Sequence, residues 1–189
     1  MNARADENPW IARRYLRASA GADDAGIEVE RLFLGSKARL GKYLVQLVGD
    51  RSLAEDLLQD TFHDAFRARD QLDDLRSAEA WLFAIARHRA LAALRRRRRL
   101  GNAFGRLVRE PHGHESDQEL LVLRDLLERH LTPDERSLLL LRYLHGFGAH
   151  ELAEIAGCSP EAVRQRLSRA RAKLLEAAAP GGRTTSGGS

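Results

Sequence analysis

The sequence GAHELAEIAGCSPEAVRQRLSRARAK, residues 148–173, decides the fold of the C-terminal part of the chain. It predicts a short helix over residues 149–156, a turn, and a longer helix that begins at Pro160. Gly157 has the backbone freedom that ends a helix, Ser159 is a good N-cap, and proline is tolerated at a first helical position, where its missing N–H is not needed. We therefore expect two helices that meet at a sharp angle.

The second of these helices divides into an apolar side and a cationic side. The apolar side can pack on the first helix, with Val163, Leu167, Ala170 and Leu174 against Leu152, Ala153 and Ile155. The opposite side is polar and has cationic flanks, Arg164 and Arg171 on one, Arg166 and Lys173 on the other. This division suits a helix in the major groove of DNA, with its middle near base edges and its flanks near phosphates. A solvated helical hairpin is the alternative, but small residues where the helices cross, Ala153 and Gly157, favour a DNA-binding helix-turn-helix.

The composition favours an all-α protein. Of the 189 residues, 31% are charged and 6% are aromatic, and the length suffices for one medium or two small domains. Cys158 is the only cysteine, which excludes an intrachain disulfide and a thiolate-only metal cage, and we expect it to be buried or half-buried in the turn. The chain has no apolar run long enough to cross a bilayer and no signal-peptide pattern, so we expect a cytoplasmic location.

Charge is distributed unevenly along the chain. The formal net charge is +4, which is modest. Residues 95–99 are five consecutive arginines and the last long helix carries a second cationic group, whereas residues 50–74 are rich in acids. This segregation predicts two kinds of partner, a polyanion for the basic surfaces and a basic surface for the acidic one.

The first 48 residues contain an extension and one long apolar pattern. Residues 1–26 form the N-terminal extension, with a break expected at residues 21–26. Its apolar cluster fits a short amphipathic helix, either docked on the body or disordered: Trp10, Ile11, Tyr15 and Leu16. Residues 27–48 predict a helix with a candidate interruption at Gly35 and Gly41.

A second helix is expected over residues 52–69. Ser52 and Glu55 have the S-x-x-E form of a capping box that would begin it. Its inward side is expected to hold Leu58, Phe62, Ala65 and Phe66. The other side forms a mainly acidic exposed surface, which we call the acidic ridge: Glu55, Asp56, Gln59, Asp60, His63 and Asp64.

Ser77 is the expected N-cap of a third helix over residues 78–98, which is apolar on more than one side near its start. It should be the most buried helix of the first domain and should emerge into solvent as the arginine run. Residues 100–118 contain glycines and a proline without sustained periodicity, which predicts a flexible linker. His112 and His114 lie in this linker with only two acids beside them, which is weak support for a metal site, and none is expected.

Two further helices precede the helix-turn-helix. Residues 119–130 have an amphipathic pattern, and Thr132, Pro133 and Glu135 combine an N-cap, a proline at the first helical position and a capping-box acid. The fold expected is therefore all-α, with two small helical domains joined by a flexible linker. Its segments are an extension (1–26), a first domain (27–99), a linker (100–118), a second domain that ends in the helix-turn-helix (119–179) and a disordered tail (180–189).

Two stretches together resemble a known family. Residues 54–99, which include the pattern DLLQDTF at residues 56–62, resemble the second conserved region of bacterial sigma factors. LTPDERSLLLLRYLHGFGAHELAEIAGCSPEAVRQRLSRARAKLLE, residues 131–176, resembles the fourth. The short linker, with nothing like the third region, is similar to that of the extracytoplasmic-function group. The chain departs from the family pattern in its N-terminal extension and in FGAH at residues 147–150.

The resemblance implies three binding surfaces. The helix that engages the clamp helices of the largest polymerase subunit is matched by Asp56, Gln59, Asp60 and Phe62. The surface that reads the downstream promoter element as single-stranded DNA, with one base flipped out, is matched by Asp74, Arg76, Trp81, His88, Arg89, Arg95 and Arg96. The helix that reads the upstream element as a duplex is matched by Glu161, Arg164, Gln165, Arg166, Arg169 and Arg171.

The resemblance therefore implies a promoter-specificity subunit that binds core RNA polymerase and promoter DNA and catalyses nothing itself. It also implies regulation by a membrane-anchored anti-sigma factor wedged between the two domains. An autonomous regulator that binds duplex DNA without polymerase is the alternative, but it has no use for the acidic ridge. An enzyme is a third reading, with little support, because the sequence has no phosphate-cradling glycine loop, no His/Cys metal spacing and no paired buried carboxylates; no cofactor is expected.

Overall fold

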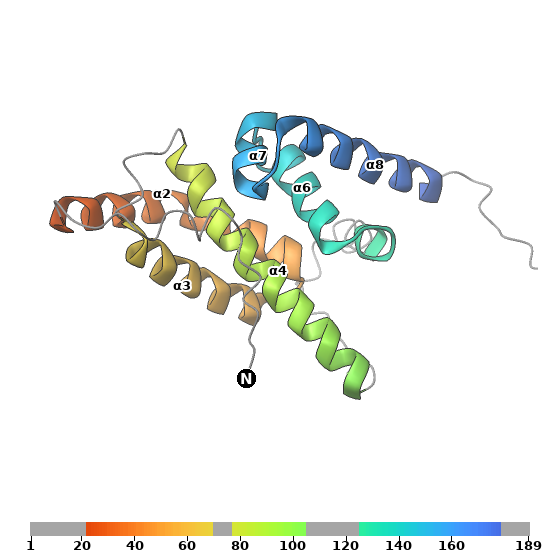
Figure 1. Cartoon of the computed structure of the whole chain (residues 1–189). Helices are drawn as coiled ribbons and strands as arrows, with labels where there is room; N and C mark the ends of the chain where they lie inside the picture. The colour runs from red at the N-terminus through yellow and green to blue at the C-terminus, as the bar shows by residue number, and fades with distance from the viewer. Residues whose placement is uncertain (1–21, 70–76, 105–124, 179–189) are drawn as a thin grey trace, which may run out of the picture.

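The computed structural model describes the backbone of residues 22–69, 77–104 and 125–178 (Figure 1). Its helices are α2 (Ala22–Val48), α3 (Arg51–Arg67), α4 (Ala78–Phe104), α6 (Pro133–Tyr143), α7 (Ala149–Ala156) and α8 (Pro160–Ala178), with a short helical segment at residues 125–130. This confirms the all-α class, and no helix in these three ranges is long and apolar enough to cross a membrane. Several expectations fall outside the described residues: the cluster of Trp10, Ile11, Tyr15 and Leu16, the linker histidines His112 and His114, the start of the amphipathic pattern at residues 119–124, and the tail at residues 180–189.

Helix α2 is one continuous helix, so the break expected at residues 21–26 and the interruption at Gly35 and Gly41 are wrong. Its apolar side is buried before and after both glycines, at Val29, Phe33, Leu40, Tyr43, Leu44, Leu47 and Val48. A glycine inside a helix costs up to about 1 kcal/mol relative to alanine, and packing of a whole helix side outweighs that cost. The helix ends where Gly49 adopts a positive φ of 70°.

Helix α3 begins two residues earlier than the sequence predicts, because Ser52 was expected to be its N-cap. The N-cap is Asp50, whose Oδ1 accepts a hydrogen bond from the Leu53 N–H at 3.0 Å, and Ser52 lies inside the helix. A carboxylate on the residue after Gly49 is as good a cap as serine, and it also favours the positive end of the helix dipole. The predicted start of α3 was therefore wrong because a second good capping residue, Asp50, lies two positions before Ser52.

The inward side of α3 also differs from the prediction. Its buried residues are small or medium in size: Ala54, Leu57, Thr61 and Ala65. Leu58 and Phe62 are half-buried, and Phe66 is 43% exposed. Small side chains let the helix axis approach α2 and α4, so the aromatic rings lie at the edge of the contact, where Phe62 packs against Phe33 with ring centroids 4.7 Å apart.

Helix α4 begins as predicted, because Ser77 Oγ accepts the Ala80 N–H at 3.1 Å. It is buried at Ala80, Leu82, Phe83, Ala86, Ala90 and Leu91. From residue 95 to residue 100 all side chains are exposed, which confirms that the helix emerges as the arginine run. It continues to Phe104, past the predicted end and into the expected linker, although Gly101 and Asn102 are poor helix formers. In Figure 1 this end of α4 projects from the body of the protein.

The helix-turn-helix is formed by α7 and α8, as predicted. Gly157 has a left-handed conformation with φ 64° at the end of α7, and Ser159 Oγ accepts the Ala162 N–H at 3.2 Å at the start of α8. Cys158 is half-buried in the turn. Upstream, the capping box between Thr132 and Glu135 begins α6. The predicted apolar sides meet: Leu152, Ala153 and Ile155 of α7 and Val163, Leu167 and Ala170 of α8 are buried, and Leu174 is half-buried.

The two halves of the protein pack directly against each other. We call α2, α3 and α4 the N-terminal module and α6, α7 and α8 the C-terminal module. Helix α4 packs on α6 and α7, and α2 packs on α6, so that buried side chains of both modules form one core. We call this contact the module interface. Helix α8 packs on α6 and α7 of its own module (Figure 1).

Candidate nucleic-acid interface

Most of the predicted upstream-element residues lie exposed on α8. Glu161, Arg164, Gln165, Arg169 and Arg171 are all exposed, and Arg166 is half-buried. Arg164 Nη1 lies 3.0 Å from Glu161 Oε1 in an ion pair along the helix. The pKa of the Glu161 carboxyl is below its ordinary value because of its own backbone N–H and the Arg164 guanidinium. Three of the four arginines predicted to read the upstream element, Arg164, Arg169 and Arg171, are therefore exposed to solvent on α8.

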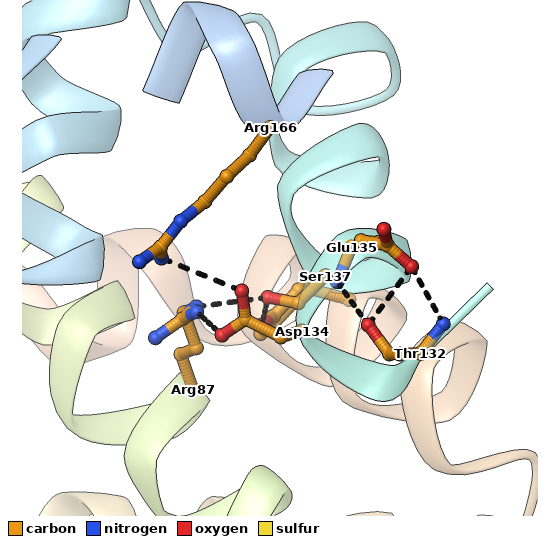
Figure 2. Close-up of polar contacts among 7 residues, drawn as sticks. Arg87, Thr132, Asp134, Glu135, Ser137 and Arg166 are labelled. Atoms are coloured by element: carbon orange, nitrogen blue, oxygen red, sulfur yellow. Dashed lines mark hydrogen bonds and ion pairs between the residues drawn. The ribbon is translucent and has the colours of Figure 1, made fainter. Parts of the chain in front are cut away.

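One flank of α8 faces α6 and is bound to its acids. Arg166 Nη1 lies 3.5 Å from Asp134 Oδ2, and Lys173 Nζ lies 2.6 Å from Glu135 Oε1. Burial disfavours ionisation of Glu135, but the hydrogen bonds from Lys173 and from Thr132 outweigh this effect and lower the pKa of its carboxyl. Figure 2 shows Arg166 reaching from α8 toward Asp134, and the Glu135 carboxylate turned back onto Thr132.

Asp134 also binds a residue of the N-terminal module. Arg87 of α4 makes an ion pair with Asp134 Oδ1 and donates from Nε to Ser137 Oγ at 3.1 Å. The Ser137 hydroxyl lies 2.8 Å from the Tyr43 hydroxyl, and both side chains are buried. Burial raises the pKa of Tyr43 to about 12, although the nearby Arg87 favours its ionised form. A network of hydrogen bonds and charges thus runs from α2 through α4 and α6 to α8.

The predicted downstream-element residues are only partly brought together. Arg95 and Arg96 are exposed on the projecting part of α4, and Trp81 is half-buried nearer its start. Asp74 and Arg76 lie outside the described residues. Burial, with the cations of Arg95 and Arg89, lowers the pKa of His88. These surroundings favour the neutral form of the His88 ring.

Arg89 is bound to the acidic ridge. Its Nε and Nη2 donate to Asp64 Oδ2 and Oδ1 at 2.5 and 2.6 Å, which is a bidentate pair. Its Nη1 also lies 3.7 Å from Asp60 Oδ2. Arg89, which was predicted to contact DNA, therefore lies beside Asp60, which was predicted to contact polymerase. The sequence did not suggest this contact.

The acidic ridge is exposed along α3. Glu55, Asp56, Gln59, Asp60 and His63 are exposed, and Asp64 is half-buried. Phe62 packs beneath the ridge against Phe33, and the exposed ring of Phe66 extends the surface beyond the predicted set. The surface therefore combines carboxylates with an apolar margin.

Sequence reasoning missed the polar residues of the module interface. Arg136 is 4% exposed, donates from Nη2 to the Leu47 carbonyl at 2.6 Å and has Glu128 at 3.4 Å. His145 is also buried, with its Nε2 3.2 Å from Gln46 Oε1, and burial with the cations of Arg39 and Lys42 lowers its pKa to about 4. The available signal was Arg136-Ser137, two polar residues at the start of a run of four leucines, because a buried helix side seldom carries them.

An aromatic cluster also lies at the module interface. Phe147, in the segment where the chain departs from the sigma pattern, is 3% exposed and packs on Phe83 with ring centroids 4.8 Å apart. Arg39 lies over the Phe147 ring and donates to the His145 carbonyl at 2.7 Å. Phe147, the first residue of this departure, thus packs in the module interface, whereas His150, the last, is exposed. Among the residues that the structure describes, no cluster of His, Cys, Asp or Glu has a geometry for a metal ion.

Comparison with known proteins supports the same two regions. The chain matches the family models "Sigma-70 region 2" over residues 32–100 and "Sigma-70, region 4" over residues 120–174. It is 32% identical over 160 residues to the RNA polymerase sigma factor CarQ of Myxococcus xanthus, covering 82% of this chain and 90% of that protein. It is 31% identical over 185 residues to the ECF RNA polymerase sigma factor SigC of Mycobacterium tuberculosis, covering 95% and 97%.

A solved structure shares the arrangement of both modules. The sigma factor RpoE of Bartonella quintana, crystallised with the anti-sigma factor NepR, superposes with a TM-score of 0.67 at 27% identity, over 79% of this chain and 95% of that one. The α3 ridge and the α8 helix-turn-helix described above lie within the matched regions 2 and 4. The chain therefore belongs to the extracytoplasmic-function (ECF) family of RNA polymerase sigma factors.

Proposed function

We propose that this ECF sigma factor docks on core RNA polymerase through the acidic ridge and reads two promoter elements with α4 and α8. The observation that carries the docking role is the ridge itself, an exposed row of carboxylates on α3 that includes Asp56 and Asp60. A protein that only bound duplex DNA would gain nothing from such a row beside its basic surfaces, because carboxylates repel phosphates. A basic surface of polymerase gives it a partner.

The DNA-reading roles follow from exposure and charge. Arg164, Gln165 and Arg169 project from α8 into solvent and suit base edges in the upstream duplex. Arg95 and Arg96 on the projecting end of α4 suit phosphates near the downstream element. By these roles, residues 27–99 and 119–179 form the two promoter-reading domains, and the protein works in the cytoplasm.

Regulation by an anti-sigma factor is proposed by analogy with RpoE, which was crystallised with NepR. An anti-sigma factor wedged between the modules, which the family resemblance implies, does not suit the packed arrangement, because Tyr43, Ser137 and Arg87 already fill the module interface. An anti-sigma factor that binds the chain with its modules packed together would contact the exposed surfaces of both modules instead.

The decisive experiment mixes the chain with core RNA polymerase and follows run-off transcription on genomic fragments. Asp56→Arg should weaken binding to core polymerase by about tenfold or more, because it places a cation in a surface that meets cations. The matched control is Asp125→Arg, which makes the same charge change at an exposed residue, 57% exposed at its side chain, outside α3. Equal binding of both variants would refute the ridge as the docking surface, and duplex binding without any transcription would favour the autonomous regulator.

A further inference from the structure

Asp134 is a counter-ion shared by two arginines from different modules. It is the second residue of α6, and its two carboxylate oxygens point to different partners, Oδ1 to Arg87 of α4 and Oδ2 to Arg166 of α8. Figure 2 shows both guanidinium groups directed at the Asp134 carboxylate. One acid therefore connects the helix that carries the downstream-element residues to the helix that carries the upstream-element residues.

The two halves of this contact differ in burial. The Arg87 side chain is 8% exposed, and it also donates to the buried Ser137 hydroxyl. The Arg166 side chain is 43% exposed, and its 3.5 Å contact is an ion pair at the surface. Because water weakens an exposed ion pair far more than a buried one, the Arg87 half holds the carboxylate in place and the Arg166 half can exchange its partner.

The natural competitor for Asp134 is a DNA phosphate. Arg166 lies on the cationic surface of α8, so a phosphate that reaches this flank must displace the carboxylate. The same carboxylate also repels that phosphate, since both are anions. Lys173, on the same flank, is held by Glu135 in the same manner, whereas Arg169 and Arg171 point into solvent.

We propose that Asp134 is an autoinhibitory residue: held in place by Arg87 of the N-terminal module, it restrains Arg166 and weakens binding of duplex DNA by α8. This rests on the proposed role of α8 as the duplex-reading helix. Asp134 and Arg166 belong to the same module, so Arg166 is released when a phosphate displaces the carboxylate or when a substitution removes it.

The experiment compares Asp134→Asn with Asp125→Asn in the full-length chain without polymerase. Both variants remove one negative charge from an exposed or half-exposed carboxylate, but only the first lies beside Arg166. The probe is a fluorescent 20-base-pair duplex of mixed sequence, followed by anisotropy over a range of salt concentrations. We expect Asp134→Asn to bind about three- to tenfold more tightly than the unmodified chain, with a salt slope steeper by about 0.9, which is one additional phosphate contact. Asp125→Asn should change the affinity by less than about twofold, as expected of a distant charge.

A double-mutant cycle assigns the gain to Arg166. Adding Arg166→Gln to Asp134→Asn should abolish the gain, and Asp134→Glu, which keeps the charge, should bind like the unmodified chain. Equal affinities for Asp134→Asn and Asp125→Asn would overturn the proposal, and so would a gain that survives Arg166→Gln. If Asp134→Asn does not fold by circular dichroism, the comparison moves to the parent chain, where Arg166→Gln must weaken duplex binding less than Arg169→Gln; equal losses would overturn the proposal.

These outcomes are separate from the test of the proposed function. A chain that supports run-off transcription but shows no effect of Asp134 keeps its function and loses the autoinhibitory contact. A chain that shows the Asp134 effect but does not bind core polymerase would lose the docking role of the acidic ridge.

Discussion

The module interface and the exposed surface of α8 both carry arginines, but in different surroundings. At the interface Arg87 and Arg136 are buried, and each is held by a carboxylate and an oxygen acceptor of defined position. On α8 Arg169 and Arg171 are exposed. A buried charge destabilises the fold when its partner is removed, whereas an exposed charge costs the fold little and stays available to a ligand. Arginines of the first kind should therefore govern stability, and those of the second kind should govern binding.

The largest effect should come from Arg136→Met. Methionine fills much of the same space, but it removes the donor to the Leu47 carbonyl and a cationic partner of the Glu128 carboxylate, whose side chain is 12% exposed. Breaking a buried pair in this way typically costs about 3 kcal/mol or more of the free energy of unfolding, measured by urea denaturation.

The matched control for this change is Arg164→Met, which breaks an exposed ion pair with Glu161. It should change the free energy of unfolding by less than about 1 kcal/mol. Similar losses for the two variants would remove the distinction between interface and surface arginines.

A pH titration should sharpen the comparison, because His145 lies at the module interface. Its pKa is lowered to about 4, so between pH 6.5 and about 4 the unfolded chain binds a proton that the folded chain does not. The contribution of His145 to the free energy of unfolding is therefore fully present above pH 6.5 and is lost as the pH falls toward 4. The loss should be on the order of 2 to 3 kcal/mol, and His145→Gln should lack this part of the pH dependence.

Urea denaturation at pH 7 and at pH 4.5 measures this difference. Because stability depends on carboxyl groups as well over this pH range, the free energy of unfolding is compared with that of His145→Gln at each pH, which isolates the contribution of the histidine. His150, which is exposed on α7, is the control: His150→Gln should keep the pH dependence of the parent chain. An unchanged pH dependence in His145→Gln would contradict the buried neutral state.

The comparison also explains which features could be predicted from sequence. The helix-turn-helix was predicted well because its signals are local: Gly157, Ser159 and the Thr132–Glu135 capping box act within a few residues of the helix ends they define. The start of α3 was not predicted correctly, because Asp50 and Ser52 are both good N-caps and only the folded backbone shows which one is used. Local sequence therefore limits the candidate helix starts to a few residues, and tertiary contacts determine which of them is observed.

Residues of the module interface could not be predicted, because their partners are distant in the sequence. Tyr43 and Ser137 are 94 positions apart, and Arg87 and Ser137 are 50 positions apart. Nothing in the periodicity of α4 distinguishes Arg87, which is buried, from Arg89 two positions later, which is bound to the acidic ridge. The exposure of the predicted α8 residues could be read from the sequence, whereas the charges enclosed by another helix, Arg87 and Arg136, were missed.

The surface side of the comparison is tested by Arg169→Ala. This exposed residue lies on the promoter-facing side of α8, so its loss should cost about 1 to 3 kcal/mol of binding free energy on the cognate upstream element and relax base preference. The free energy of unfolding should change by less than about 0.5 kcal/mol. Binding to the cognate element and to random duplex, each measured by anisotropy, gives the specificity ratio. A loss of equal size on both would mean that Arg169 contacts phosphate alone.

The smallest effect should come from the arginine run. Arg96→Gln removes one exposed cation from the projecting end of α4, so it should weaken binding to every DNA sequence by about two- to fivefold at low salt and reduce the salt slope by about 0.9, without changing base preference. Arg97→Gln is an instructive companion, because Arg97 already lies 3.4 Å from Asp50 Oδ2, and that carboxylate both caps α3 and competes with phosphate. Arg97→Gln should therefore cost less DNA affinity than Arg96→Gln. If Arg97→Gln costs as much or more, the ion pair with Asp50 does not restrain this cation, and exposure alone decides which arginines of the run meet DNA.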